Sequence, residues 1–405
     1  MHIAFFTNSY LPVVSGVVSS LRSYRKALSE IGHTIFVFAQ DENYQDQEPF
    51  IFRYPSFHLP LESNIPAVIP ISPHIDWLLP SLKLDLIHSH HPVLVGQAAA
   101  RKARELDLAL VFTFHSQYRE YTNYIPIPQE AVQNFLKNAV NNWLREYMRK
   151  CQHIVVPSES MLDILKKEYG LESHYTVIPT GIDLERFVDE DGSNIRSQYG
   201  WETDRVMISI GRLAPEKNWN TLLHGAARAM DMYKNLRLII LGDGPERKTL
   251  QKLCDELGVS SRVKFPGEVP LSDVPAYLRS ADMFIFASTS ETQGLVTLEA
   301  LAAGLPVVAV DASGTRDIVE DGCQGFLVEN HPDALTEAVV RLMEDEELTA
   351  RLKKSAVKRA ESFDILKTAK KLVSVYEQAI RDKERDLYVN VREPGMPALI
   401  DSDSA

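Results

Sequence analysis

Two blocks of alternating short apolar runs and longer helix-patterned segments, separated by one polar segment, constrain the fold more than any other feature of this sequence. The first block starts with HIAFFT, then VVSSLRSYRKALSEIG and HTIFVFAQ, and continues through LDLIHSH, ALVFTFH and HIVVPS to YTVIPTGID. This alternation predicts β-α-β units and therefore a parallel sheet with helices on both faces.

The second block repeats the pattern, with RVMISIG, LRLIILGDG, RVKFPG, DMFIFAS and LPVVAVD as the expected strands. We therefore predict an α/β protein of two doubly wound, Rossmann-like parallel-sheet domains that face a cleft. The predicted domains are residues 1–184 and 205–364, with an acidic linker at 185–204. A helix at about 365–388 is expected to cross back to the first domain, and residues 389–405 to form a flexible tail.

Composition excludes several classes of function. The 405 residues include 43 Lys and Arg against 55 Asp and Glu, and the net charge of −12 disfavours nucleic-acid binding. Cys151, Cys254 and Cys323 are far apart, which excludes a disulfide scaffold and favours a reducing cytoplasm. No stretch reaches the roughly 18 apolar residues of a membrane span, and the N-terminus does not resemble a signal peptide. We expect a cytoplasmic protein that meets a membrane only at its surface.

The densest cluster of candidate functional residues is GRLAPEKN, residues 211–218, after the first strand of the second block. Gly211 permits a turn, and Arg212 and Lys217 can converge on one anion. Diphosphate is the natural candidate, and a pair of solvated loop cations is the alternative.

A second cluster is STSETQGLVTLEALAAG, residues 288–304, after the strand DMFIFA. Glu291 falls in the strand-to-helix loop, and Gly294 lets the backbone close tightly. Glu299 lies one turn inside the following helix, where it can accept hydrogen bonds from sugar hydroxyls. Taken alone, each glutamate is better explained as a capping or an exposed acid. The helix start, whose free N–H groups favour a phosphate, is formed by Leu295, Val296 and Thr297.

Together these motifs resemble the donor site of the family-4 retaining glycosyltransferases, which have the GT-B fold. The resemblance rests on G-R-x(4)-K from Gly211 to Lys217 and E-x(7)-E from Glu291 to Glu299. It covers nearly the whole chain, because four further motifs match in order. These are Ser15-Gly16-Val17, TFH at 113–115, IPTGID at 178–183 and LGDGPE at 241–246.

The resemblance implies a role for each matching residue. Arg212 and Lys217 would hold the diphosphate of a nucleotide-sugar donor, assisted by the helix start and by Gly16 across the cleft. Glu299 would bind the ribose and Glu291 the hydroxyls of the transferred hexose. His115 would contact that sugar near the reacting centre. The implied reaction is a retaining hexosyl transfer, with UDP-glucose or UDP-galactose as the expected donor.

No metal or other cofactor is expected. The DxD matches, residues 189–191 and 401–403, do not follow predicted strands, so we expect Arg212 and Lys217 to stabilise the leaving group instead. Because no N-domain motif offers a carboxylate nucleophile, same-face attack is favoured over double displacement. LIHSHHP places His88 and His90 on one strand face, where a structural histidine or an acceptor contact is favoured over a metal ligand.

The acceptor side has weaker signals. Prolines interleaved with apolar residues between Phe50 and Pro80 predict an apolar acceptor entrance, or a packed irregular crossover. HSQYREYTNYIP is similar to the matching stretch of bacterial diacylglycerol glycosyltransferases, which implies diacylglycerol or glycosyl-diacylglycerol as the acceptor. A soluble or polysaccharide acceptor, a GT-B epimerase and a non-catalytic nucleotide-sugar-binding module are the alternatives. The acceptor-side candidates are His90, Tyr118, Tyr121 and Tyr124.

The helix after this stretch carries a continuous apolar stripe from Val132 to Met148, which indicates core packing or a membrane-surface helix. Over residues 101–150, eight cations outnumber five acids, against the sign of the whole chain. We therefore expect peripheral binding to an anionic membrane surface, on its cytoplasmic face.

Overall fold

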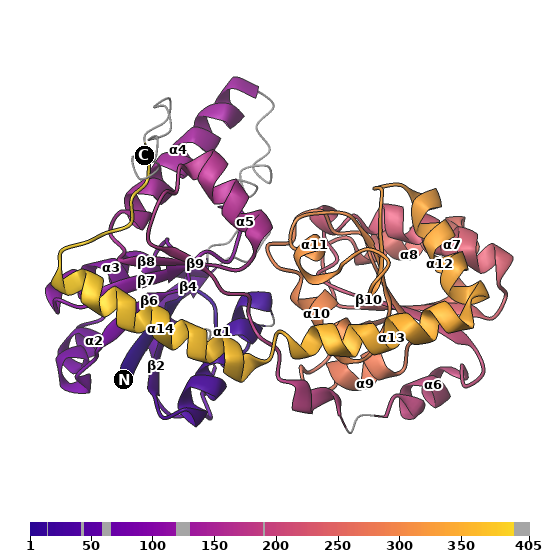
Figure 1. Cartoon of the computed structure of the whole chain (residues 1–405), viewed down its shortest axis with the longest axis horizontal. Coiled ribbons are helices and arrows are strands. Elements are labelled where there is room, and N and C mark those ends of the chain that lie inside the picture. The colour runs from indigo at the N-terminus through magenta and orange to yellow at the C-terminus, as the bar shows by residue number, and fades with distance from the viewer. Residues whose placement is uncertain (14, 42–43, 59–65, 119–129, 189–190, 393–405) are drawn as a thin grey trace, which may run out of the picture. The chain divides into compact units, whose positions relative to one another are not determined.

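The computed structural model describes the chain apart from residues 14, 42–43, 59–65, 119–129, 189–190 and 393–405 (Figure 1). The chain forms two compact units. The first contains Met1–Ile178 and the chain from Ala369 onward, and the second contains Pro179–Thr368. Each unit is built on one parallel sheet with helices, which confirms the predicted pair of Rossmann-like domains.

The first unit has a seven-stranded sheet of order β3-β2-β1-β6-β7-β8-β9, and every pair in it is parallel. The order reverses between β1 and β6, and sheets of this kind bind ligands at the carboxyl ends of the strands at such a switch point. The strands are β1 His2–Thr7, β2 Thr34–Gln40, β3 Ile51–Tyr54, β6 Leu86–Ser89, β7 Ala109–Thr113, β8 His153–Val156 and β9 Tyr175–Val177.

Helices of the first unit are α1 Gly16–Glu30, α2 Pro73–Leu78, α3 Val95–Glu105, α4 Glu130–Met148 and α5 Glu159–Ile164. The carboxyl-terminal part of α4 is packed in the core, with Leu144, Tyr147 and Met148 buried. The Tyr147 hydroxyl donates to Ser89 Oγ at 2.7 Å, at the end of β6. Core packing therefore accounts for this part of the apolar stripe, while the side chains of residues 130–135 lie outside the description.

The proline-rich segment is more regular than predicted. It contains β3, an antiparallel pair of β4 Ser56–His58 with β5 Pro66–Val68, and then α2 and the 3-10 helix η1 Leu79–Leu82. Pro73 does not prevent the helix because it stands at the first helical position, where no hydrogen bond from its nitrogen is needed. Ile71 and Trp77 are exposed here, with 57% and 79% of their surface accessible.

The second unit has a six-stranded parallel sheet of order β12-β11-β10-β13-β14-β15, with its switch point between β10 and β13. The strands are β10 Arg205–Ile210, β11 Leu236–Leu241, β12 Val263–Gly267, β13 Met283–Phe286, β14 Val307–Val310 and β15 Gly325–Val328. The helices are α6 Ser193–Tyr199, α7 Trp219–Met232, α8 Arg247–Glu256, α9 Val274–Arg279, α10 Leu295–Ala302, α11 Thr315–Ile318, α12 Pro332–Glu344 and α13 Glu346–Glu361.

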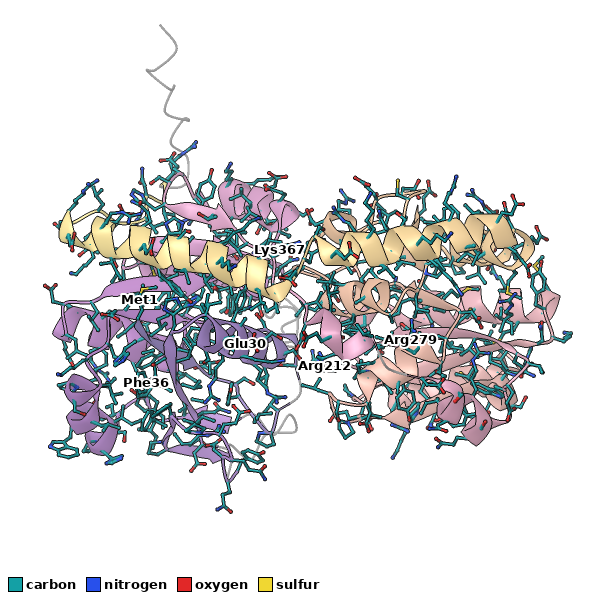
Figure 2. All side chains as sticks on the ribbon, turned by 60° about the horizontal axis from the view of Figure 1, so that its bottom comes forward. Met1, Glu30, Phe36, Arg212, Arg279 and Lys367 are labelled. Atoms are coloured by element: carbon teal, nitrogen blue, oxygen red, sulfur yellow. The ribbon has the colours of Figure 1, made fainter. Side chains whose placement is uncertain are left out.

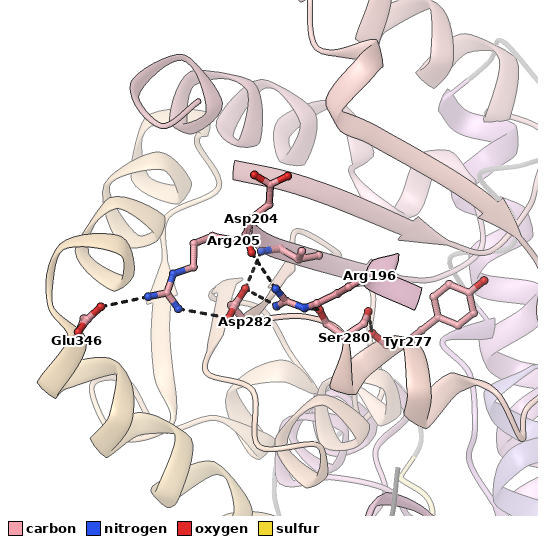
Figure 3. A network of polar contacts seen from close by, with 8 residues as sticks. Arg196, Asp204, Arg205, Tyr277, Ser280, Asp282 and Glu346 are labelled. Carbon is pink, nitrogen blue, oxygen red and sulfur yellow. Dashed lines mark hydrogen bonds and ion pairs between the residues drawn. The ribbon is translucent and has the colours of Figure 1, made fainter. Parts of the chain in front are cut away.

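Residues 185–204, predicted to be a linker, lie within the second unit, because the chain enters that unit at Pro179. Asp282, just before β13, ties this segment to the sheet, as Figure 3 shows. It accepts hydrogen bonds from Arg196 Nη2 and from the backbone N–H of Val206, both at 2.8 Å. Arg205 reaches Asp282 and Glu346 as well. The polar composition of the segment therefore reflects internal ion pairing in addition to solvation.

Helix α14 Ile365–Glu384 starts in the second unit, near Lys367 in Figure 2, and continues into the first. Its Tyr376 is fully buried and lies 2.7 Å from His88 Nδ1. Part of the predicted tail is ordered, because Val389 N–H donates to the carbonyl of Cys151 and Arg392 N–H to that of Gly170. Residues 393–405 lie outside the described residues. No helix in the described parts is long and apolar enough to cross a bilayer.

Candidate active site

The loop 211–218 leaves the carboxyl end of β10, as the sequence predicts. The first residue of α7, Trp219, supports the backbone of this loop. Its indole N–H donates to the carbonyl of Arg212 at 3.0 Å, and the indole ring is buried. The loop ends in a short 3-10 helix, Pro215–Lys217, followed by Asn218 in the left-handed conformation. Figure 2 labels Arg212 on this loop, and 60% of its side chain is exposed.

The glycine-rich stretch LGDGPE supports this loop. Gly242 has φ +132°, and a Cβ on it would lie 2.1 Å from the carbonyl oxygen of Gly211. Two backbone bonds then join the loops, from Leu213 N–H to Asp243 O at 2.8 Å and from Glu246 N–H to Leu213 O at 2.9 Å. The glycines therefore allow two loops after neighbouring strands to cross in backbone contact, which fixes the path of residues 211–213.

Lys217 and Glu291 come together in the structure, from the loops that follow the neighbouring strands β10 and β13. Lys217 Nζ lies 2.5 Å from Glu291 Oε1, and only 21% and 14% of the two side chains are exposed. The buried Ser288 hydroxyl donates to the same carboxylate oxygen at 2.8 Å. The other predicted cation, Arg212, contacts Glu216 Oε1 at 2.5 Å. Both cations are therefore neutralised by a glutamate of the same unit.

Helix α10 begins directly after these side chains. Its N-cap is Gly294, in the left-handed conformation at φ 82°, and it provides no side-chain bond to the first turn. Gly314 brings a second loop against this one, since a Cβ there would lie 2.7 Å from Glu291 O. Leu295 and Val296 are partly exposed, and Thr297 is buried. A glycine cap leaves the first-turn amides uncovered by its own side chain, as a phosphate site needs.

Glu299 has a partner that the motifs did not reveal. Arg186 Nη1 lies 3.7 Å from Glu299 Oε1, and the Arg186 side chain also donates to Leu271 O at 2.6 Å. Burial raises the pKa of the Glu299 carboxyl, and the charge of Arg186 opposes that rise. Arg186 lies in η4 Leu184–Phe187, inside the segment predicted to be a linker, so no motif pointed to it.

Gln293 is a further residue that sequence reasoning missed. It is buried between Glu291 and Gly294, and its side-chain amide makes two bonds to the backbone of Thr180. Thr180 belongs to the IPTGID motif, 113 residues earlier in the sequence. Gln293 stands at an unspecified position of the E-x(7)-E motif, so the motif gives no signal of such a partner, and only the structure brings the two motifs together.

In the first unit, His115 and His90 meet at the carboxyl ends of β7 and β6. Their Nε2 and Nδ1 atoms are 2.9 Å apart, and the rings are stacked at 5.2 Å. The ring centroid of His88 lies 4.1 Å from that of His90. The two ring nitrogens of His88 make hydrogen bonds with the hydroxyls of Tyr376 and Thr113.

Burial is the main cause of the pKa shifts of His88, His90 and His115. It lowers the pKa of His115 to about 3 and the pKa of His88 and His90 well below the usual value, with neighbouring histidines adding to the effect. The rings are therefore neutral near pH 7, and in the His90–His115 contact one ring donates and the other accepts.

The remaining candidates in the first unit have mixed outcomes. Gly16 is the first residue of α1, where Ser15 Oγ caps the helix by accepting from Val18 N–H. The ring of Tyr118 is buried edge-on against Phe114 and packs in the core of the first unit. Tyr121 and Tyr124 lie outside the described residues. Among the side chains that the structure describes, no group of three or more His, Cys, Asp or Glu could hold a metal ion.

Comparisons with known proteins identify the class to which this fold and these loops belong. The second half, residues 191–359, matches the family model "Glycosyl transferases group 1", and residues 14–186 match "Glycosyltransferase Family 4". A structure of Anabaena Alr3699/HepE in complex with UDP and glucose superposes with a TM-score of 0.75 at 22% identity, over 93% of this chain and 99% of that one. The chain is thus a glycosyltransferase of the GT-B fold.

Two curated relatives define the family further. The alpha-monoglucosyldiacylglycerol synthase of Acholeplasma laidlawii is 29% identical over 88% of this chain and 92% of the relative. The enzyme of the same name from Streptococcus pneumoniae is 31% identical over 84% of this chain and 78% of the relative. The chain belongs to the family-4 glycosyltransferases, as its motifs predicted.

Proposed function

We propose that this glycosyltransferase moves a hexose from a nucleotide sugar to a diacylglycerol-type lipid, with retention at the anomeric carbon. The observation that carries the proposal is the cluster of Lys217, Glu291 and the start of α10 at the switch point of the second sheet. Two relatives are named as monoglucosyldiacylglycerol synthases, which supports the lipid acceptor. The UDP and glucose in the HepE structure support UDP-glucose or UDP-galactose as the donor.

In this proposal, the second unit stabilises the leaving diphosphate. Breaking the anomeric C–O bond places negative charge on the diphosphate, and preorganised positive groups stabilise that charge most when they are shielded from water. Lys217 is mostly shielded, whereas Arg212 is largely exposed, so we assign the larger contribution to Lys217. With these cations and the helix start, the transfer proceeds without a metal ion. Retained turnover in the presence of EDTA is the matching test.

Two carboxylates would orient the donor. Glu291 would accept from hydroxyls of the hexose once Lys217 turns towards phosphate, because it lies at the entrance of α10. Glu299, with Arg186 beside it, would accept from the ribose hydroxyls. Both roles use the strong hydrogen bonds that an ionised carboxylate accepts.

The first unit would supply neutral groups next to the reacting carbon. Because its pKa is lowered to about 3, His115 can contact a sugar hydroxyl without adding positive charge beside an oxocarbenium-like centre. His90 would fix which ring nitrogen of His115 carries its proton. Retention then results from same-face attack by the acceptor hydroxyl.

The decisive experiment is a donor panel of UDP, GDP and ADP sugars with diacylglycerol in mixed vesicles. We expect one hexosyl-diacylglycerol product with the α-anomeric configuration of the donor, read by mass and NMR. A soluble sugar as the sole acceptor, or donor binding without any transfer, would refute the lipid acceptor or the enzymatic role, respectively.

We also propose peripheral binding of the first unit to a membrane surface, on the cytoplasmic face. Two of the cations counted for this role are otherwise engaged. Lys102 is buried beside Asp76 and Glu105, and Arg145 is buried with its guanidinium on the carbonyls of residues 168 and 169. The stronger support is the exposed apolar surface at Ile71 and Trp77.

Flotation with vesicles tests this second proposal. Trp77→Ala should weaken binding to vesicles that contain anionic lipid, whereas Val188→Ala, at an exposed apolar residue of the second unit, should not. Equal flotation of Trp77→Ala and wild type would contradict the role of Trp77. The absence of any flotation would contradict membrane binding itself.

A further inference from the structure

Gln293 joins the loop of the candidate donor site to a distant segment by a matched pair of hydrogen bonds. Its Oε1 accepts from Thr180 N–H at 2.7 Å, and its Nε2 donates to Thr180 O at 2.8 Å. Both residues are buried, with 4% and 7% of their surface exposed. A side-chain amide has a donor and an acceptor side by side, so it can satisfy both backbone groups of one residue.

Thr180 lies where the chain enters the second unit, at Pro179, and the chain leaves that unit at Thr368. We call residues 179–183 and 363–368 the crossing segments. They are fastened to each other by backbone bonds from Ile182 N–H to Phe363 O at 2.8 Å and from Ile365 N–H to Ile182 O at 3.1 Å. Any displacement of Thr180 is therefore shared by both crossing segments.

The crossing segments are in close contact at Gly181. A Cβ at this position would lie 2.4 Å from the hydroxyl of Thr368 and 2.6 Å from Cα of Ile365. The two segments thus pack backbone to backbone within the second unit. This is why a glycine is needed here even though its φ is not in the left-handed region.

We propose that Gln293 is a positioning residue that couples the donor loop to the crossing segments. The inference rests on the proposed function, since it takes the diphosphate and hexose of the donor as the ligand of Glu291 and of the α10 start. A ligand held by these two groups fixes the backbone on either side of Gln293. The paired bonds transmit that constraint to Thr180, because both are made by buried groups and both must break before the donor loop and Thr180 can move apart.

Donor binding therefore steadies the segments through which the chain passes between its units. We expect loss of the Gln293 bonds to lower turnover and to leave donor affinity nearly unchanged. Donor affinity is spared because Gln293 bonds to Thr180 and not to Glu291 or Lys217. Gln293→Leu should lower kcat by about tenfold and change the Kd for UDP by less than about twofold.

Hydrogen exchange with saturating UDP tests the coupling directly. In the wild type, UDP should protect the backbone amides of residues 288–299 and of both crossing segments. In Gln293→Leu, protection at 288–299 should persist, and protection of the crossing segments should disappear. Gln293→Glu keeps the acceptor for Thr180 N–H but loses the donor, so its crossing segments should show intermediate protection.

The matched control is Gln324→Leu. Gln324 is also a buried glutamine of the second unit, and its side chain accepts from Glu320 N–H at 2.8 Å and donates to Ser355 Oγ at 3.3 Å. It should cost similar thermal stability while leaving UDP-dependent protection of the crossing segments unchanged. A loss of that protection in Gln324→Leu equal to the loss in Gln293→Leu would overturn the proposal as a general stability effect.

The other outcomes separate this inference from the proposed function. Crossing segments that UDP leaves unprotected in the wild type, or that stay protected in Gln293→Leu, would overturn the coupling. Loss of protection at 288–299 in both Gln293 variants would also overturn it, because Gln293 would then hold only the donor loop. An absence of protection at 288–299 in the wild type would instead refute the donor site itself.

Discussion

Replacing Lys217 by alanine tests the central chemical role assigned to the second unit. The variant loses the cation that lies 2.5 Å from Glu291 and is 21% exposed. Removal of one preorganised group that stabilises anionic charge typically lowers kcat by about 10² to 10³, or about 3 to 4 kcal/mol. We expect that loss at saturating donor, measured by radiolabelled hexose transfer into the lipid fraction.

The effect of the same change on folding is smaller. A pair with this exposure lies between a surface ion pair and a buried one, so its removal should cost about 1 to 2 kcal/mol of unfolding free energy. That loss leaves the protein folded at 25 °C and does not account for a change in kcat of two orders of magnitude. Thermal melting of the variant checks this point.

Two further variants complete the test. Lys252→Ala removes an exposed lysine that pairs with Glu256 in the same unit, and it should leave turnover unchanged. The double variant Lys217→Ala with Glu291→Gln should cost less than the sum of the single variants, because the two side chains touch. A Lys217→Ala enzyme with near-wild-type kcat at saturating donor would refute the assignment of the leaving-group role.

The remaining predictions concern pH and the loop support. Burial raises the pKa of Glu299, and its ionised form is the stronger acceptor of hydrogen bonds from hydroxyls. UDP affinity should therefore fall as the pH decreases, and the fall should begin at a pH above the usual glutamate pKa of about 4.3. Arg186→Gln removes the opposing charge and should move this decline to higher pH in calorimetric titrations; superimposable curves for the two proteins would contradict the pairing. Gly242→Ala should lose about 2 to 3 kcal/mol in urea unfolding, since its Cβ meets Gly211 O. Gly258→Ala, at φ +69° with nothing nearby, should lose about 1 kcal/mol, and equal losses would disprove the backbone clash.

Strands that are buried on both faces were the most predictable part of the fold. HIAFFT and RVMISI are mainly apolar because helices cover both sides of a parallel sheet, and they form β1 and β10, in each of which five of the six residues are buried. The four-residue strands β3 and β15 were not predicted. β3 contains Arg53, which is held by Asp46, and β15 begins with Gly325, where a Cβ would lie 1.8 Å from Val307 O. Neither residue is typical of a strand.

The candidate site was predictable where chain topology alone brings residues together. Lys217 and Glu291 follow neighbouring parallel strands, whose carboxyl ends must lie side by side. Arg186 and Gln293 could not be found in this way. Their partners are a carboxylate and a backbone segment more than a hundred residues away in the sequence, and no periodicity records such a contact.

Glu216 and Glu291 pair with Arg212 and Lys217, so they compete with any anion that binds these two cations. Inorganic phosphate brings charge with few hydroxyl groups, so in binding these cations it would displace Glu216 or Glu291 and leave a carboxylate without its cation. A nucleotide sugar brings hydroxyl groups that can rebond the carboxylate it displaces. At the proposed donor site, discrimination against free phosphate would therefore depend on the acids of the two loops rather than on their bases.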